Sequence, residues 1–240
     1  MILAASVDSA LADIEGLPRV RRLADGAWSG GATPIVVVAP DPDGVVAAAL
    51  AGAPVTLAEP APEAGGPVAQ IVRGIEVAAG ITSETDAALV WPARMVWIGP
   101  ETITSLIEAH GTAPGAVLRP TFEGKAGWPA LVPIAELERL RSQSPELMPG
   151  DLIGGLVAAG ALEERLDLGD PGSTHDASVA RADLPPYVGP PEPAAGHTHE
   201  WGDAVAGHED DPVEGPRRAP LATGSSGRED GGDGGRSGPA

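Results

Sequence analysis

The sequence contains no cysteine, and this absence removes several kinds of chemistry at once. Disulfide bonds, thiolate nucleophiles and cysteine-ligated zinc sites are excluded in a chain without a thiol. Positive charge is also scarce: Lys125 is the only lysine, and the net charge is −19. Because nucleic acids and anionic membranes select basic surfaces, this excess of acidic residues argues against both as partners.

Long hydrophobic runs and aromatic residues are missing as well. No apolar run approaches the ~20 residues that a membrane-spanning helix needs. The first residues, Met1–Ala5, lack the basic start of a signal peptide, so we expect a cytoplasmic protein. Aromatic residues make up only 3% of the chain, against 42% hydrophobic residues in total. The core must therefore consist of Ala, Val, Leu and Ile, which favours an α/β fold over a small β-sandwich.

The first part of the chain alternates between strand and helix patterns. Residues 34–40, for example, form a continuous β-branched run, which is typical of a strand buried on both faces. Strands are expected at 2–5, 34–40, 54–57, 87–91, 115–119, 130–132 and 162–168. Helices are expected at 20–28, 43–51, 67–79, 100–110, 134–141 and 151–159. This alternation predicts a three-layer sandwich with a mostly parallel sheet, whose ligands bind beyond the carboxyl ends of the strands.

Composition changes sharply near Leu184 and divides the chain into two parts. Residues 1–184 form the predicted domain, and residues 185–240 are rich in Pro, Gly, Asp and Glu. Such a segment buries too little apolar surface to offset its ordering entropy, so we expect a disordered acidic tail, which could serve as an arm for a protein partner. His197, His199 and His208 could bind a divalent metal there, but scattered histidines of a disordered tail are the favoured interpretation.

Several short motifs occur in an order that resembles the MobA-like NTP transferases, a family that includes the nucleotidyltransferases of molybdenum-cofactor maturation. The resemblance covers about residues 1–180. It is carried by Ile2–Ala5, like the family's first strand and LAAG turn, and by Gly16-Leu-Pro18, like its G-x-P-L segment. It continues with Gly65-Gly-Pro-Val-Ala69 (G-P-L-A), Leu89–Thr102 (L-P-x-D-x-P…P-E-T), Arg119–Pro129 (P-x-x-x-G-x-x-G-H-P) and Asp170–Asp176 (the closing acidic motif).

The resemblance implies a nucleotide-diphospho-sugar transferase-like fold and a set of site residues. Ala4 and Ala5 would contact the nucleotide, and Gly65, Gly66 and Pro67 would contact its base. The acceptor side would be lined by Gly127, Trp128 and Pro129. Asp176 would bind Mg²⁺, with an NTP as the substrate.

The sequence departs from the family's pattern where phosphate and metal would bind. The segment Ser6–Ala10 replaces a loop with glycines, Arg and a following Lys, and its Asp8 would repel a triphosphate. Arg94 stands at the position of the metal-binding Asp, Trp128 replaces a His, and Ser178 replaces one residue of the closing acidic pair. Arg94 could itself act as a cation over phosphate.

Two functions therefore remain open, beside a third possibility that Arg94 and the Trp residues serve a different ligand in the same cleft. One is a nucleotidyltransferase, which moves a nucleotidyl group from an NTP to a phosphorylated acceptor such as a molybdopterin-type cofactor. The other is a non-catalytic homologue that binds a nucleotide or cofactor, or acts as a partner protein. Two further groups are expected to be structural: Trp91, Trp97 and Trp128 as packing residues that could also stack a flat ring, and Arg19, Arg21 and Arg22 as a solvated helix face.

Overall fold

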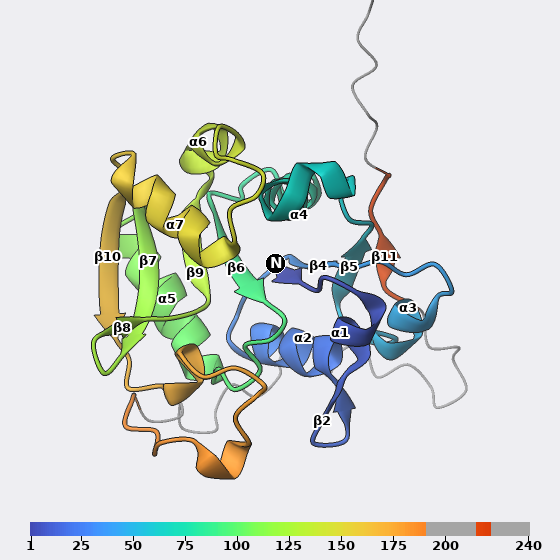
Figure 1. The fold of residues 1–240 in the computed structure, drawn as a ribbon, viewed down its shortest axis with the longest axis horizontal. Helices are drawn as coiled ribbons and strands as arrows, with labels where there is room; N and C mark the ends of the chain where they lie inside the picture. Colours follow the sequence, from blue (N-terminus) through green and yellow to red (C-terminus); the bar gives the residue numbers. More distant parts are fainter. Residues whose placement is uncertain (191–214, 222–240) are drawn as a thin grey trace, which may run out of the picture.

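The computed structural model describes residues 1–190 and 215–221. It has three layers, with helices on both faces of one sheet (Figure 1). From edge to edge the strands are β10 (Leu162–Asp167), β7 (Ala116–Phe122), β9 (Ala130–Pro133), β6 (Ala87–Pro92), β1 (Ile2–Leu3), β4 (Ile35–Val38), β5 (Val55–Ala58) and β11 (Arg217–Arg218). The ninth strand, β8 (Lys125–Ala126), pairs with β7. Only β8 and β9 run antiparallel to their neighbours, so the predicted mostly parallel sheet is confirmed.

Helices cover the two faces of the sheet unevenly. One face carries α4 (Gly66–Ile81), α6 (Leu137–Arg141) and α7 (Pro149–Ala158), and the other carries α2 (Arg19–Ser29) and α5 (Pro100–Thr112), with α1 (Val7–Leu11) and α3 (Val45–Ala49) beside α2 (Figure 1). A small hairpin, β2 (Asp13–Ile14) with β3 (Leu17–Pro18), joins α1 to α2. Short 3₁₀ turns occur at η1 (Glu63–Gly65), η2 (Ile134–Glu136), η3 (Pro171–Ser173) and η4 (Arg181–Asp183).

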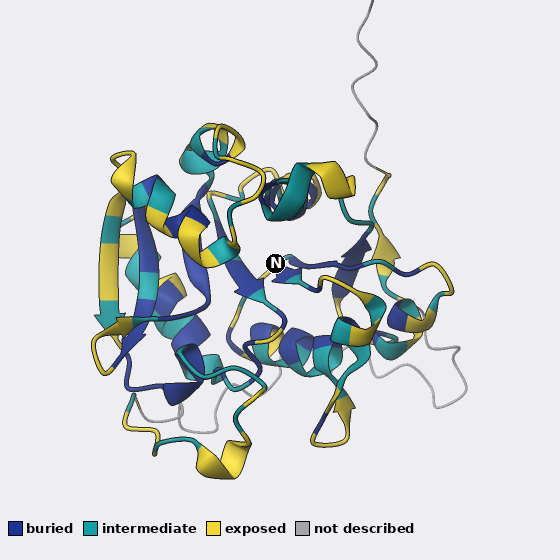
Figure 2. Cartoon of the chain, in the orientation of Figure 1, coloured by how far each residue is buried: buried dark blue, intermediate teal, exposed yellow. Residues whose placement is uncertain are grey.

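The core lies around the central strands and consists of aliphatic side chains, as the composition predicts. Every residue of β4, β5 and β9 is buried, because helices cover both faces of the sheet there. Figure 2 shows these strands as the buried centre of the molecule and β10 as an exposed edge. Each fully buried Leu, Ile or Val side chain contributes roughly 1.5–3 kcal/mol relative to exposure.

The predicted elements between residues 2 and 168 are confirmed in type and order, with two corrections. The expected helix at 134–141 consists of the turn η2 followed by the shorter α6. Most of the segment Ser6–Ala10, where the resemblance predicts a phosphate loop, belongs to α1, whose amino terminus is capped by the Ser6 hydroxyl accepting the Ser9 amide at 3.1 Å. The hairpin β2–β3 and the short strands β8 and β11 were not predicted.

Most of the predicted tail, with His197, His199 and His208, lies outside the described residues. Two parts of it are described. Residues 185–190 follow the loop after β10, where the Val188 amide donates to the Gly169 carbonyl at 3.0 Å. Residues 215–221 contain β11. Within the two described ranges, no helix combines the length and apolar character needed to cross a bilayer.

Candidate functional site

A cavity of about 210 Å³ opens where the sequence places several candidate residues. Its walls come from three segments: the loop after β6, the β7–β8 hairpin with the residues that follow it, and the loop after η3. The lining residues are Arg94, Met95, Lys125, Ala126, Gly127, Trp128, Ser173, Thr174 and Asp176. Three of these residues are charged, and two of the three are cations.

Asp170 fixes the loop that carries Ser173 and Asp176. Its carboxylate is buried and accepts hydrogen bonds from the Thr102 hydroxyl at 2.7 Å, the Gly99 amide at 3.1 Å and the Gly172 amide at 2.8 Å. Burial raises the pKa of Asp170, and the three donated hydrogen bonds oppose that rise. Because two of the donors belong to the start of α5, this one side chain joins the site loop to the rigid part of the fold.

Further backbone contacts hold the three walls together. The Trp128 amide donates to the Ser173 carbonyl at 2.8 Å, and the Ala177 amide donates to the Arg94 carbonyl at 2.9 Å. The Trp128 ring is 6% exposed, and the Arg119 guanidinium lies 5.7 Å from its centroid. Arg119 also donates to the Gly127 carbonyl at 3.1 Å, so the aromatic wall of the cavity is held in one orientation.

Gly127 is required where the hairpin meets the site loop. A Cβ at this position would overlap the Ser173 carbonyl. We expect Gly127→Ala to lower the free energy of unfolding by about 2 kcal/mol, because neither backbone segment can retreat without breaking the Trp128–Ser173 hydrogen bond. The midpoint of thermal unfolding measures this loss of stability. The control is Gly111→Ala on α5, where a Cβ meets open space and helix propensity favours Ala; equal midpoints for the two variants would refute the close approach.

The charges around the cavity are unevenly matched. Hydrogen bonds from the Ser178 hydroxyl at 2.6 Å and the Ser178 amide at 3.0 Å lower the pKa of Asp176. Burial opposes this lowering, and the nearby charges of Arg94 and Arg19 add to it. Asp176 is therefore ionised at neutral pH. Arg94 and Lys125, both exposed, give the cavity a net positive character in a chain whose overall charge is −19.

The structure brings together four of the residues singled out from the sequence. Arg94, Gly127, Trp128 and Asp176 all line this cavity, and Pro129 is buried directly beside it. Lys125 was missed, although its status as the only lysine was an available signal.

The five expected nucleotide contacts lie elsewhere. Ala4 is buried and its amide donates to the Val38 carbonyl at 3.0 Å, while Ala5 is exposed. Gly65, Gly66 and Pro67 are half-buried at the start of α4. Gly66 has φ of +59°, and its Cα faces the Pro145 carbonyl so closely that a Cβ would overlap it. These five residues line neither this cavity nor the second one described below, and their roles stay predictions.

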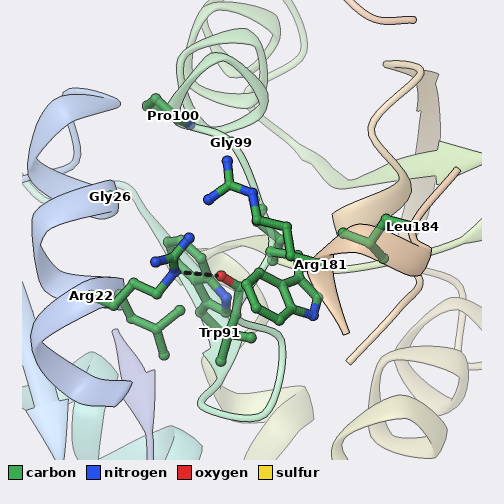
Figure 3. A pocket seen from close by; sticks show the side chains of 11 residues that line it. Arg22, Gly26, Trp91, Gly99, Pro100, Arg181 and Leu184 are labelled. Atoms are coloured by element: carbon green, nitrogen blue, oxygen red, sulfur yellow. Dashed lines mark hydrogen bonds between the residues drawn. The ribbon is translucent and has the colours of Figure 1, made fainter. Parts of the chain in front are cut away.

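A second cavity, of about 250 Å³, lies between α2, the residues after β6 and the segment 181–184 (Figure 3). Trp91 and Trp97 form part of its walls. The Arg22 guanidinium lies 5.3 Å from the Trp97 ring centroid, and Arg22 shares the Glu15 carboxylate with Arg181, each at 3.1 Å. The expectation that Arg22 belongs to a solvated face is therefore wrong, because Arg22 pairs with the hairpin and packs on an indole ring.

The sequence matches the profile of the MobA-like NTP transferase domain over residues 5–153, more than half of the chain. This chain belongs to that family. No curated protein sequence matches it. The loop with Asp170 and Asp176 lies beyond the matched residues.

Solved structures share the fold at low sequence identity. A nucleotidyl transferase from Methanothermobacter thermautotrophicus is 16% identical, with a TM-score of 0.55, covering 69% of this chain and 84% of that one. Rv0371c from Mycobacterium tuberculosis, solved in complex with manganese, is 18% identical with a TM-score of 0.53, covering 69% and 86%. The 4-diphosphocytidyl-2C-methyl-D-erythritol synthase of Anaerococcus prevotii is 8% identical with a TM-score of 0.55, covering 74% and 89%.

Helix α1 follows strand β1 after a short link, in the segment where the motif resemblance predicts a phosphate loop. The Ser6 hydroxyl already accepts the Ser9 amide, and Asp8 places a negative charge in the first turn. A carboxylate there stabilises the helix dipole and repels a phosphate. The segment Ser6–Ala10 is thus a capped helix start, and it lacks the glycine, Arg and Lys residues that the resemblance predicts for a phosphate loop.

The residues around the first cavity do not fit a divalent cation well. Within residues 1–190 and 215–221, no three His, Cys, Asp or Glu side chains come close enough to hold a metal ion together. Asp176 supplies one carboxylate, which Ser178 already engages, and two cations, Arg94 and Lys125, line the same cavity. Magnesium prefers oxygen ligands and carboxylate charge, so a guanidinium at the strand end works against it.

Proposed function

We propose that this member of the MobA-like family binds a phosphorylated small molecule in the cavity between Arg94, Lys125 and Asp176. Arg94 and Lys125 would contact the phosphate oxygens, without a metal ion held by the protein. The observation that carries this proposal is that Arg94, just beyond the end of β6, lines one cavity with Lys125, the chain's only lysine. The motif resemblance predicts that Arg94 stands where the family has a metal-binding Asp.

The chemistry of the side chains supports an anionic ligand. A guanidinium presents a planar fork of N–H donors that matches a phosphate in two places, and an ammonium adds a compact point charge. Asp176 would accept a hydrogen bond from a hydroxyl of the ligand, because its pKa is lowered and its carboxylate stays ionised. The buried ring of Trp128 gives the cavity an apolar wall. A sugar phosphate or a nucleotide would satisfy all of these groups.

A second function is nucleotidyl transfer from an NTP to a phosphorylated acceptor, for which a molybdopterin-type cofactor is one candidate. The family match and the position of Asp176 favour it. In that case Asp176 would be the protein's ligand to Mg²⁺, and the phosphates would supply most of the remaining oxygen ligands. The acceptor would lie against Gly127, Trp128 and Pro129.

Ligand-dependent thermal unfolding of the full chain separates the two functions. We expect tripolyphosphate and at least one of CTP, GTP, ATP and UTP to raise the midpoint without added metal. A ligand that binds only the folded state at 100 times its Kd adds about 2.7 kcal/mol, or several degrees for a protein of this size.

The same titrations are repeated with Mg²⁺. A rise that appears only with Mg²⁺ would favour nucleotidyl transfer and contradict binding by side-chain cations. No rise with any of the five compounds at millimolar concentration would overturn both functions.

A further inference from the structure

Residues 215–221 contain an additional strand, β11, at one edge of the sheet. Strand β11 pairs in parallel with β5, with Arg217 beside Thr56 and Arg218 beside Leu57, and the Ala219 amide donates to the Leu57 carbonyl at 2.9 Å. In Figure 1 this strand, drawn in red, lies alongside β5 near α3. A segment more than 150 residues away in sequence thereby completes the β5 edge.

Arg218 connects this strand to the carboxyl ends of β4 and β5. Its guanidinium lies 2.6 Å from the Asp41 carboxylate and 3.7 Å from that of Glu59. The Asp41 side chain is fully buried and also accepts the Val46 amide at 2.8 Å and the Ala47 amide at 3.3 Å. Burial raises the pKa of Asp41, but the hydrogen bonds from Val46, Arg218 and Ala47 and the Arg218 charge outweigh it, so the pKa lies below its ordinary value. Arg218 therefore meets a carboxylate that is charged at neutral pH.

The same segment also contacts helix α4. Arg73 of α4 donates to the Pro220 carbonyl, and Ala219 packs against the cluster that contains Val36, Val38 and Ala58. Residues 217–220 thus touch the ends of β4 and β5 and the flank of α4. Ligands of parallel α/β sheets bind at this carboxyl edge, and the expected contacts to a nucleotide base, Gly65–Pro67, open α4.

We propose that residues 217–220 are an internal cap that closes the carboxyl edge of β4 and β5 to a nucleotide and is displaced when one binds. The identity of the ligand rests on the proposed function, whereas the docking of the segment does not. The cap is built to be reversible. Only two of its residues, Arg217 and Arg218, pair with β5, and both arginines remain exposed while the segment is docked. Asp41 keeps two backbone hydrogen bonds when Arg218 leaves, so opening does not strand a bare buried charge.

Docking can be measured directly because the natural chain has no thiol. Ala219→Cys places a single cysteine in a half-buried position of the docked segment, and its rate of reaction with a maleimide reports how often the segment opens. Adding Arg218→Ala should raise that rate about tenfold. Adding Arg217→Ala should change it less than twofold, because both ion pairs that the strand makes with the described residues come from Arg218. Equal rates in the three proteins would overturn the cap.

Displacement is measured with the same three proteins and the nucleotides that bind in thermal unfolding. A bound nucleotide should speed the maleimide reaction of the Ala219→Cys protein, and Arg218→Ala should tighten nucleotide binding severalfold while leaving tripolyphosphate affinity unchanged. A nucleotide that binds without changing the labelling rate would overturn the cap's role in closing the edge.

The two proposals can fail separately. If tripolyphosphate binds but no nucleotide binds even after Arg218→Ala, the cap closes no ligand site and this inference is wrong, while the anion site at Arg94 stands. If neither tripolyphosphate nor any nucleotide binds any of the proteins, the proposed function is wrong as well. The cap as proposed requires two results. Arg218→Ala must raise the maleimide rate more than Arg217→Ala does, and a bound nucleotide must raise the rate of the Ala219→Cys protein.

Discussion

Asp170→Ala should be the most destabilising single substitution at the site. It removes the acceptor of three hydrogen bonds at once, and leaves the buried Gly172 amide, the buried Thr102 hydroxyl and the half-buried Gly99 amide without their partner. Each unsatisfied buried donor costs about 1–3 kcal/mol, so we expect a total loss of about 4 kcal/mol. The unfolding midpoint should fall by on the order of 10 °C, as measured by circular dichroism or calorimetry.

Asp170→Asn and Asp167→Ala complete this experiment. The Asn side chain keeps one acceptor oxygen but turns its amide NH₂ group toward the remaining donors. The loss of unfolding free energy for Asp170→Asn should therefore lie between those of Asp170→Ala and Asp167→Ala. Asp167 is exposed on β10, only three residues away, and its removal should cost less than about 0.5 kcal/mol. Similar midpoints for Asp170→Ala and Asp167→Ala would show that the buried carboxylate does not anchor the loop. Burial raises the pKa of Asp170, so its own contribution to stability is largest at acidic pH and declines as the pH rises through the folded-state pKa.

Arg94→Asp should have the largest effect on ligand binding. The substitution changes the cavity from two cations and one carboxylate to one cation and two carboxylates. We expect tripolyphosphate affinity without metal to fall about thirtyfold, which corresponds to about 2 kcal/mol, because an attractive charge becomes a repulsive one. Isothermal titration calorimetry measures the loss directly. The same variant should gain affinity for Mn²⁺, since two carboxylates that line one cavity are donors that hard cations select.

The control for this exchange is Arg165→Asp, which makes the same change of charge on the exposed edge strand β10. It should leave tripolyphosphate binding within about twofold of the natural chain, as screening limits distant surface charges. Equal losses in both variants would mean that net charge, and not the cavity, governs binding. Nucleotidyl transfer activity that appears with Arg94→Asp and Mn²⁺ would indicate a decayed active site, whereas loss of binding alone would indicate a repurposed one.

The alternating architecture could be predicted from the sequence because its signals are local. The β-branched run of β4 and the Pro-Glu-Thr start of α5 each specify an element without help from distant residues. The short elements could not be predicted for the opposite reason. Strand β11 has two residues and exists only because the β5 edge and Asp41 are there to receive it. Strand β8 likewise depends on the turn at Glu123 and Gly124, both with positive φ.

The candidate site was predictable in part. Its family motifs identify Arg94, Gly127, Trp128 and Asp176, which the fold brings to one cavity. The motifs could not predict which distant segments of the chain contact each of these residues. The Pro145 carbonyl, from a segment about 80 residues later, lies close to Gly66. No local sequence pattern predicts such a contact. The anchoring role of Asp170 is equally non-local, because its partners Gly99 and Thr102 precede it by about 70 residues.

The two edges of the sheet differ in how they are protected against pairing with another molecule. An open strand edge can recruit the same strand of another molecule, and proteins suppress this with charged side chains or by covering the edge. Strand β10 is protected by charged side chains, which are Glu163, Glu164, Arg165 and Asp167. The β5 edge is apolar and buried and relies on being covered by β11. Shortening the chain before residue 215 would therefore expose an unpaired, apolar strand, and we expect such a truncated domain to self-associate more readily than the full chain.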